Sequence, residues 1–264
     1  MHHTSARLLA VFSPHPDVTL LRLESAMPSQ GLLAGQFLMA KVAGVRWDPF
    51  LREPLFLAGH EPETGAITLW VPGGAPSRER LRALPLHTEL DLLGPMGVGV
   101  APHQEWRNLL LVAEGLAVGP LLLAMETALR AGQAVALLSV TPSEQTPYPA
   151  DALPVSIEYQ RATRGEAGVV TQELIRWADG VIAAGSQQFY HHLVNELKNG
   201  RPGQRGGFAY GLLLEPFGWQ PNSMCWGPTR VACAAAACRA CLVELRREKP
   251  LACADGPTFD LWSL

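Results

Sequence analysis

The distribution of cysteines constrains this chain more than any other feature. All five cysteines lie in the last quarter of the 264 residues. Four of them follow the spacing C-x4-C-x2-C-x11-C, from Cys233 through Cys238 and Cys241 to Cys253. A disulfide framework would spread its cysteines along the chain and would need an oxidising compartment. Clustered cysteines in a chain without a recognisable export signal favour a metal centre instead.

The spacing is typical of a plant-type [2Fe–2S] cluster. Three thiolates on one short loop wrap the two irons and their sulfides, and a fourth arrives from a separate segment. A structural zinc module usually contains two C-x2-C pairs, whereas this chain has one. We therefore expect a cluster on these four cysteines, with zinc or four unligated buried thiols as alternatives. Cys225 lies outside the pattern and is expected to be a structural thiol, not a ligand.

The residues between the ligands are unusual for such a loop. Glycine is common there because it adopts left-handed backbone angles and lets amide groups approach the sulfurs. This chain has Ala234, Ala236 and Ala240 in those places. An alanine held at positive φ would cost about 1–2 kcal/mol. Arg239, between two ligands, is expected to point into water and not to balance the charge of the cluster.

Composition and charge exclude several classes of protein. Hydrophobic residues make up 48% and charged residues 17%, which allows a packed core. The net charge of −3 does not suggest a nucleic acid or an anionic membrane as partner. The apolar run 109–129 is interrupted by Glu114, Gly115, Pro120 and Glu126, so it is expected to form a buried strand, a turn and a helix, not a membrane span. We expect a soluble, cytoplasmic protein.

The apolar pattern divides the chain into three expected domains. Residues 1–101 contain short apolar runs separated by proline and glycine, as in an antiparallel barrel. In residues 102–205 strands alternate with helices, which predicts α/β architecture with a parallel sheet. Residues 206–264 hold the cysteine module. Expected strands are 8–12, 18–23, 36–42, 55–58, 67–71, 108–113, 135–140, 155–159 and 180–184, with a tight turn at 92–97 and helices at 120–131, 170–178 and 188–198.

The cysteine segment and earlier motifs resemble the electron-transfer subunits of class 1B dihydroorotate dehydrogenases. Val231–Cys241 and Cys253–Phe259 are similar to the "MACGxGACxGC" and "VCxDGPVF" segments of that family. Ala34–Met39 is similar to its "PGQF" strand, Leu93–Gly99 to "LGPLGNGF" and Gly168–Thr171 to "GxVT". The resemblance covers nearly the whole chain in the expected order.

The resemblance implies a ferredoxin-reductase-like oxidoreductase with an FAD-binding barrel, an NAD-binding α/β domain and a C-terminal [2Fe–2S] module. Electrons would pass between NAD(P)H, FAD, the cluster and a separate FMN-containing catalytic subunit of pyrimidine biosynthesis, so we expect a hetero-oligomer. It implies no catalytic residue on this chain. The implied FAD contacts are Arg52, Pro54, Leu55, Gly73 and Gly74, and Gly115 would lie at the nicotinamide nucleotide.

The nucleotide motifs depart from those of the family. In the segment similar to "RRPISI", Glu53 stands in place of an arginine that pairs with phosphate, and Phe56 in place of a serine. Pro76 removes an N–H from the turn that corresponds to "GKGT". The "GGGIGVPPL" turn becomes Ala113–Leu121, and the cysteine of "CGP" becomes Ala184. These departures leave an alternative, a cluster-bearing relay or assembly subunit that has lost FAD, NAD or both.

Overall fold

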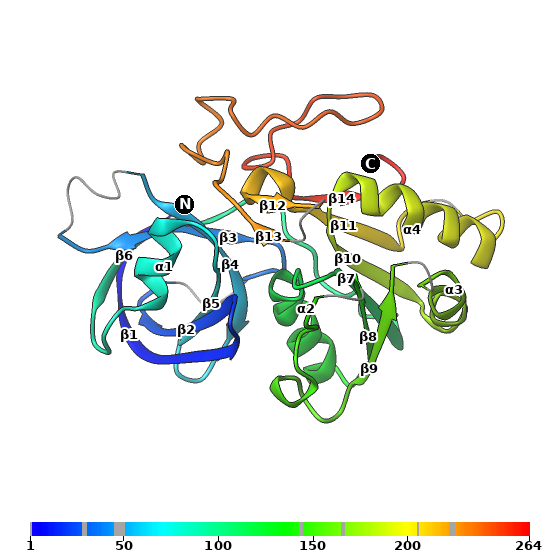
Figure 1. Ribbon diagram of the computed structural model, residues 1–264, viewed down its shortest axis with the longest axis horizontal. Helices are drawn as coiled ribbons and strands as arrows, with labels where there is room; N and C mark the ends of the chain where they lie inside the picture. Colours follow the sequence, from blue (N-terminus) through cyan, green and yellow to red (C-terminus); the bar gives the residue numbers. More distant parts are fainter. Residues whose placement is uncertain are drawn as a thin grey trace.

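The computed structural model describes residues 2–27, 31–44, 51–142, 145–164, 167–204, 206–221 and 225–264. At positions 167, 169, 170 and 225 it describes the backbone alone. A closed barrel and an α/β sheet lie side by side (Figure 1), and the cysteine-rich segment, in orange and red, runs along one edge above their boundary.

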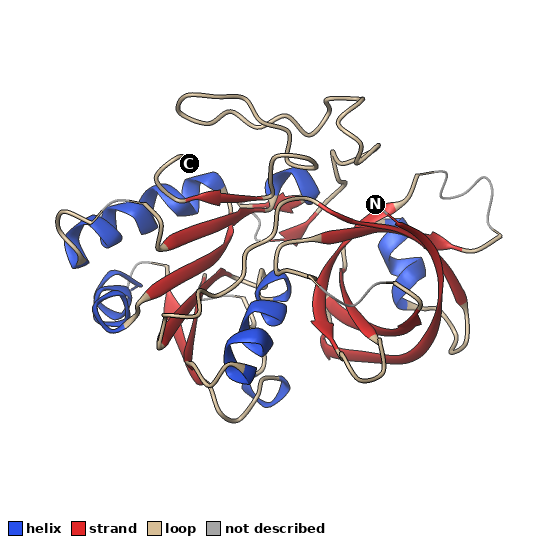
Figure 2. Cartoon of the chain, turned by 180° about the vertical axis from the view of Figure 1, so that it is seen from behind, coloured by secondary structure: helices blue, strands red, loops and turns tan. Residues whose placement is uncertain are grey.

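The barrel forms because alternate residues of its strands are apolar and point inward. In β6, for example, Leu90, Leu92 and Met96 are buried while their neighbours are partly exposed. The sequence predicted a tight turn at 92–97, but the period of two continues through Met96 and makes this segment the last barrel strand. The strands close into a barrel (Figure 2). Their order around it is β1-β2-β5-β4-β3-β6. Its strands are β1 (His2–His15), β2 (Val18–Ser25), β3 (Phe37–Val42), β4 (Glu53–His60), β5 (Ile67–Pro72) and β6 (Glu89–Met96), and helix α1 (Pro76–Arg82) follows β5.

The second layer is a six-stranded sheet in the order β14-β11-β10-β7-β8-β9. Its strands are parallel except β14, which is antiparallel to β11. Helix α2 packs between this sheet and barrel strand β4, whereas α3 and α4 lie together away from the barrel (Figure 1). The elements are β7 (Asn108–Glu114), α2 (Gly119–Arg130), β8 (Ala134–Thr141), β9 (Glu158–Thr163), α3 (Ala167–Trp177), β10 (Gly180–Gly185), α4 (Gln187–Gly200), β11 (Ala209–Leu213) and β14 (Thr258–Asp260).

The fold class expected from the sequence, a barrel followed by a parallel α/β sheet, is confirmed. Two details differ. Segment 206–264 supplies β11 and β14 to the α/β sheet, so its ends are continuous with that layer. Strand β9 lies three residues later than expected at 155–159, because Val155 is fully exposed while Ala162 is buried.

The apolar run 109–129 forms β7 and α2, as predicted. Every residue of β7 after Asn108 is buried, which is usual for a central parallel strand covered on both faces. No helix among the residues described is long and apolar enough to cross a membrane.

Candidate functional site

Three of the four predicted ligands lie on one irregular loop, and the fourth returns to it. Cys233, Cys238 and Cys241 fall in a stretch without helix or extended strand. The backbone N–H of Ala252 donates to the carbonyl of Cys241 at 3.0 Å, which holds the Cys253 segment against the loop. Strand β14 begins shortly afterwards and leads the chain back into the sheet (Figure 1). The sequence-distant fourth ligand is thus brought to the other three.

The four thiols interact with one another. The side chain of Cys233 interacts with that of Cys238, and the side chain of Cys253 interacts with those of Cys241 and Cys233. Among the described residues, no three His, Cys, Asp or Glu side chains converge on a point that a single ion would occupy. A structural zinc ion needs four donors around one point. A [2Fe–2S] cluster takes four thiolates over two irons, and the four thiols brought together here are of the kind it needs.

Backbone amides are already directed at two of the sulfurs. The pKa of the Cys233 thiol is lowered to about 7 because the N–H groups of Cys238 and Ala235 donate to its sulfur, at 3.3 and 3.5 Å. Burial and then the thiol of Cys241 raise the pKa of Cys253 to about 11, against the opposing N–H of Ala236. Hydrogen bonds to the ligand sulfurs are one of the means by which proteins tune an iron–sulfur cluster.

The loop carries left-handed backbone at three residues that are not glycine. Ala234 and Ala236, two of the alanines that stand where glycine is common, have φ of 50° and 59°. The third is Arg239 at 57°, whereas Ala240 does not have positive φ. Arg239 is exposed, in agreement with a side chain that points into water. These angles turn successive amides towards the sulfurs, and the loop holds strained alanines to achieve this.

Replacing Ala236 by glycine should therefore stabilise the loop by about 1–2 kcal/mol, because glycine adopts this φ without a steric penalty. Ala236 is exposed, so little packing is lost. The measurement is the urea concentration at which the visible absorbance of the cluster-loaded chain disappears, which should rise. The matched control is Ala235→Gly at a neighbouring exposed position without positive φ, which should lower it or leave it unchanged. Equal shifts for both variants would contradict the prediction.

The residues predicted to contact FAD interact with other groups of this chain instead. Arg52 pairs with Asp91 at 2.6 Å and donates to its carbonyl at 2.8 Å. Pro54 and Leu55 are buried in the barrel wall. Glu53, which stands where the family has an arginine, lies among groups of this chain that would otherwise suit a phosphate.

At the turn of Gly73 and Gly74, the group that approaches closely is protein backbone and not a phosphate. A Cβ on Gly74, whose φ is 93°, would lie 2.0 Å from the carbonyl oxygen of Trp226. The N–H of Gly73 donates to the carbonyl of Asp17 at 2.8 Å, and that of Gly74 to the carboxylate of Glu79 at 3.1 Å. Both amides that the family would offer to a phosphate have partners here.

Groups of this chain also occupy the turn that was predicted to bind the nicotinamide nucleotide. The N–H of Gly115 donates to the carbonyl of Val140 at 2.8 Å. At the start of α2 a Cβ on Gly119 would lie 1.8 Å from the ring of Trp70, so this barrel residue covers the helix terminus. Glu114 has no exposed surface and pairs with Arg164 at 2.5 Å.

The residues present in these two places do not fit a bound flavin or nicotinamide nucleotide. A side chain that lines a binding cleft keeps accessible surface when the ligand is absent, but Leu55 is 1% exposed and Glu114 is 0% exposed. A hollow of about 240 Å³ remains beside Glu53, between the start of β4 and residues 228–232. That is below the roughly 300–1,000 Å³ of ordinary ligand pockets. The binding of FAD and NAD(P)H stays a prediction, and the contacts within the chain weigh against it. The residues of that prediction are Arg52, Pro54, Leu55, Gly73, Gly74 and Gly115.

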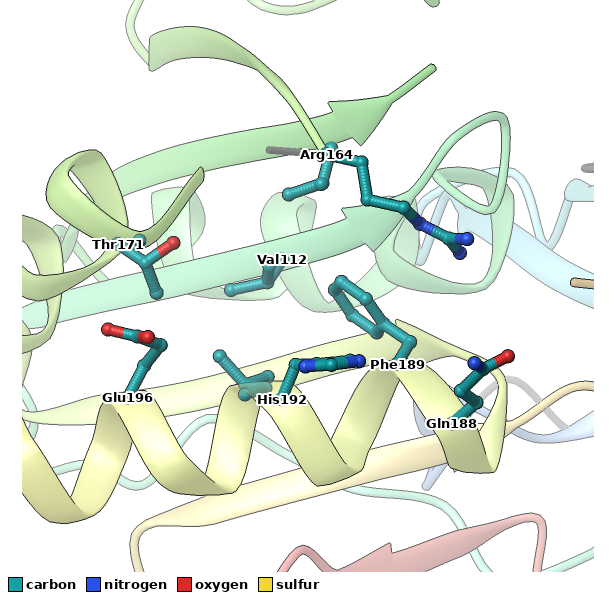
Figure 3. A pocket seen from close by; sticks show the side chains of 10 residues that line it. Val112, Arg164, Thr171, Gln188, Phe189, His192 and Glu196 are labelled. Carbon is teal, nitrogen blue, oxygen red and sulfur yellow. The ribbon is translucent and has the colours of Figure 1, made fainter. Parts of the chain in front are cut away.

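A separate cavity of about 280 Å³ lies between the sheet and helices α3 and α4 (Figure 3). Gln188, Phe189, His192 and Glu196 line it from α4, and Arg164 lies on the opposite side. None of the described residues that line it belongs to the turn 115–120. The cavity thus lies outside the nucleotide place that the sequence predicted.

The sequence interpretation missed the residues that fill the predicted flavin place. They are Arg78 on α1 and three aromatic residues that precede Cys233, namely Phe217, Trp219 and Trp226. The available signal was the concentration of large aromatic residues in a segment otherwise rich in turn residues. Elements in this segment are η2 (Glu215–Phe217), β12 (Trp219–Gln220) and β13 (Cys225–Trp226), which we call the aromatic hairpin.

Comparison with solved structures identifies the architecture. A chain of NADH-dependent reduced ferredoxin-NADP oxidoreductase superimposes with a TM-score of 0.72 and 18% identity over 98% of this chain and 88% of that one. Phthalate dioxygenase reductase gives a TM-score of 0.59 and 15% identity over 78% of this chain and 66% of its own. The chain has the ferredoxin-reductase fold.

A curated relative gives a more particular likeness. The chain is 35% identical over 103 residues to the electron transfer subunit of dihydroorotate dehydrogenase B (NAD(+)) from Shouchella clausii (strain KSM-K16). The aligned region spans 38% of this chain and 39% of that relative. No family model matches the chain.

Proposed function

We propose that this chain is an electron-transfer subunit that carries a [2Fe–2S] cluster on Cys233, Cys238, Cys241 and Cys253 and exchanges electrons with a partner oxidoreductase. The observation that carries the proposal is that the Cys253 segment returns to the loop of Cys233, Cys238 and Cys241, where backbone amides donate to the sulfur of Cys233. When bound, such a cluster takes up and gives back one electron at a time. The protein supplies the thiolates, the amides directed at them and a loop that holds both.

The position of the loop supports transfer between proteins. Residues 235–240, which include Cys238 and Arg239, are exposed. A cofactor held there would lie near the surface, within reach of a second protein. The relative described above is by name a subunit of dihydroorotate dehydrogenase B. We propose a partner of the same kind, a flavin- or metal-containing oxidoreductase that docks over this loop near Arg239.

A second candidate follows from the name of that relative, which includes NAD(+). In this alternative the chain itself oxidises NAD(P)H through FAD and passes the electrons to its cluster. The ferredoxin-reductase fold supports it, and the occupied nucleotide places weigh against it.

The cluster is tested by anaerobic purification followed by iron and sulfide assays and a visible spectrum. We expect about two irons and two sulfides in each chain and a red-brown colour that bleaches on reduction. A colourless protein with one zinc ion in each chain would overturn the proposal, and so would a chain that takes up no metal in reconstitution.

The partner is tested by affinity purification of the tagged chain from its native cells. We expect a flavin- or metal-containing oxidoreductase to be retained, and to be lost when Arg239 is replaced by glutamate. Recovery of this chain alone, together with complete substrate turnover by it, would contradict a partner. The variant Arg247→Glu, also exposed and in the same segment, serves as the charge-matched control.

A further inference from the structure

We infer that this chain binds neither a flavin nor a nicotinamide nucleotide, because its aromatic hairpin and two carboxylates, Glu53 and Glu114, occupy the places of those ligands. The inference rests on the proposed function in one respect: it leaves another protein as the source of the electrons that reach the cluster.

The first carboxylate lies where a flavin phosphate would lie. Glu53 accepts a hydrogen bond from the hydroxyl of Ser77 and pairs with the guanidinium of Arg78 at 3.3 Å. A hydroxyl and a guanidinium at the start of a helix are groups that bind phosphate. Here both are directed at a carboxylate of the same chain. Glu53 thus supplies internally the negative charge that a nucleotide would bring.

The same arginine fastens the aromatic hairpin over this carboxylate. Arg78 donates to the carbonyl of Phe217 at 2.8 Å, and its guanidinium carbon lies 5.7 Å from the ring centre of Trp226. One nitrogen, Nη1, has no hydrogen-bond partner, yet the side chain is only 1% exposed. The contacts with Phe217 and Trp226 hold the hairpin against this buried guanidinium.

The ring of Phe217 fills the space beside β4 where an isoalloxazine would stack. Its centre lies 4.8 Å from that of Phe37 and 4.8 Å from that of Phe56. All three rings are at most 2% exposed. Contacts of this kind form a packed aromatic cluster with no room for a further ring. Phe56, which stands in place of a serine of the family, is one wall of this cluster.

The second carboxylate closes the nicotinamide place and ties it to the hairpin. Glu114 accepts from the N–H of Ser186 at 2.8 Å and from the indole N–H of Trp219 at 2.9 Å. Ser186 caps the N-terminus of α4, a terminus that favours negative charge. The salt bridge to Arg164 balances the buried charge. Trp219, which belongs to the aromatic hairpin, therefore connects the residues that fill the nicotinamide place with those that fill the flavin place.

The test uses the full chain, purified anaerobically and loaded with its cluster. We expect no flavin to be released on denaturation, and no FAD, NADH or NADPH to be retained after equilibrium dialysis against excess nucleotide. Stoichiometric flavin in the purified chain, or saturable binding of any of the three nucleotides, would overturn the inference. Iron and sulfide are assayed on the same sample, so loss of the cluster contradicts the proposed function, whereas uptake of a nucleotide contradicts only this inference.

A double variant tests whether the hairpin and Glu53 exclude the flavin. Glu53→Arg combined with Phe217→Ala removes the internal carboxylate and opens the aromatic cluster. We expect it to bind FAD at least about tenfold more tightly than the parent chain. The matched control is Phe208→Ala, which truncates an equally buried phenylalanine beside Trp262, outside the two nucleotide places. If the double variant binds FAD no better than this control, the hairpin is not the cause of exclusion, and that part of the inference is wrong.

Discussion

Replacing Cys241 by serine is expected to abolish the cluster, with iron and sulfide falling from about two each per chain to near zero. Cys241 is 1% exposed and its side chain interacts with that of Cys253, so a serine there would remove one of the four thiolates that would hold the cluster, in a buried place. Cys253→Ser should have the same effect, because it removes another of the four thiolates. Iron and sulfide assays on anaerobically purified protein measure both changes, and circular dichroism shows whether the fold is retained.

Cys225→Ser is the matched control, because it is the same substitution at the cysteine outside the spacing. We expect its iron content to equal that of the parent. If Cys225→Ser abolished iron binding and Cys253→Ser did not, the ligand set would be wrong. The side chain of Cys225 lies outside the described residues, so its expected exclusion rests on the sequence spacing.

Replacing Arg78 by methionine is expected to lower the free energy of unfolding by about 3–5 kcal/mol. The substitution keeps most of the apolar length but leaves the carboxylate of Glu53 without its cation and the carbonyl of Phe217 without its donor. Leaving a largely buried charge without its partner is costly, and the side chains of Arg78 and Glu53 are 1% and 13% exposed. Urea denaturation followed by circular dichroism measures the change.

Arg7→Met provides the comparison for this prediction. Arg7 pairs with Glu24 at 2.5 Å, but both side chains are more than half exposed. Exposed ion pairs contribute roughly 0–1 kcal/mol, so this variant should change little. The double variant Glu53→Leu and Arg78→Met should recover part of the loss, because it removes both charges together. Equal destabilisation by Arg78→Met and Arg7→Met would show that the buried pair does not hold the hairpin.

The fold class could be predicted because its signals are local. Period-two apolar runs indicated the barrel, and strands alternating with helices indicated the parallel sheet. Strand β14 was missed because it has three residues and its pairing with β11 is set by contacts across the cysteine loop. Helix α1 was missed because its seven residues include mostly polar side chains.

The site could be predicted only in part, for a similar reason. Three of the proposed cluster ligands lie within nine residues of sequence, so their spacing is visible directly. The filling of the nucleotide places depends on pairs far apart in the chain, such as Glu114 with Trp219, 105 positions away, and Arg78 with Phe217, 139 positions away. Considered alone, the carboxylate of Glu53 is expected to repel a phosphate. Its partners Ser77 and Arg78 become apparent only when β4 and α1 are brought together.

The pairing of β11 with β14 has a consequence for how the cysteine loop forms. Residues 214–257 leave the sheet at one strand and return at its neighbour, so strand pairing joins the two ends of the loop without metal. The entropy of closing a loop grows only slowly with length, by about 0.6 kcal/mol for each doubling. A loop closed in this way can contain an additional hairpin at little cost. Because the sheet fixes the two ends of this segment, its length can change without preventing its thiols from coming together.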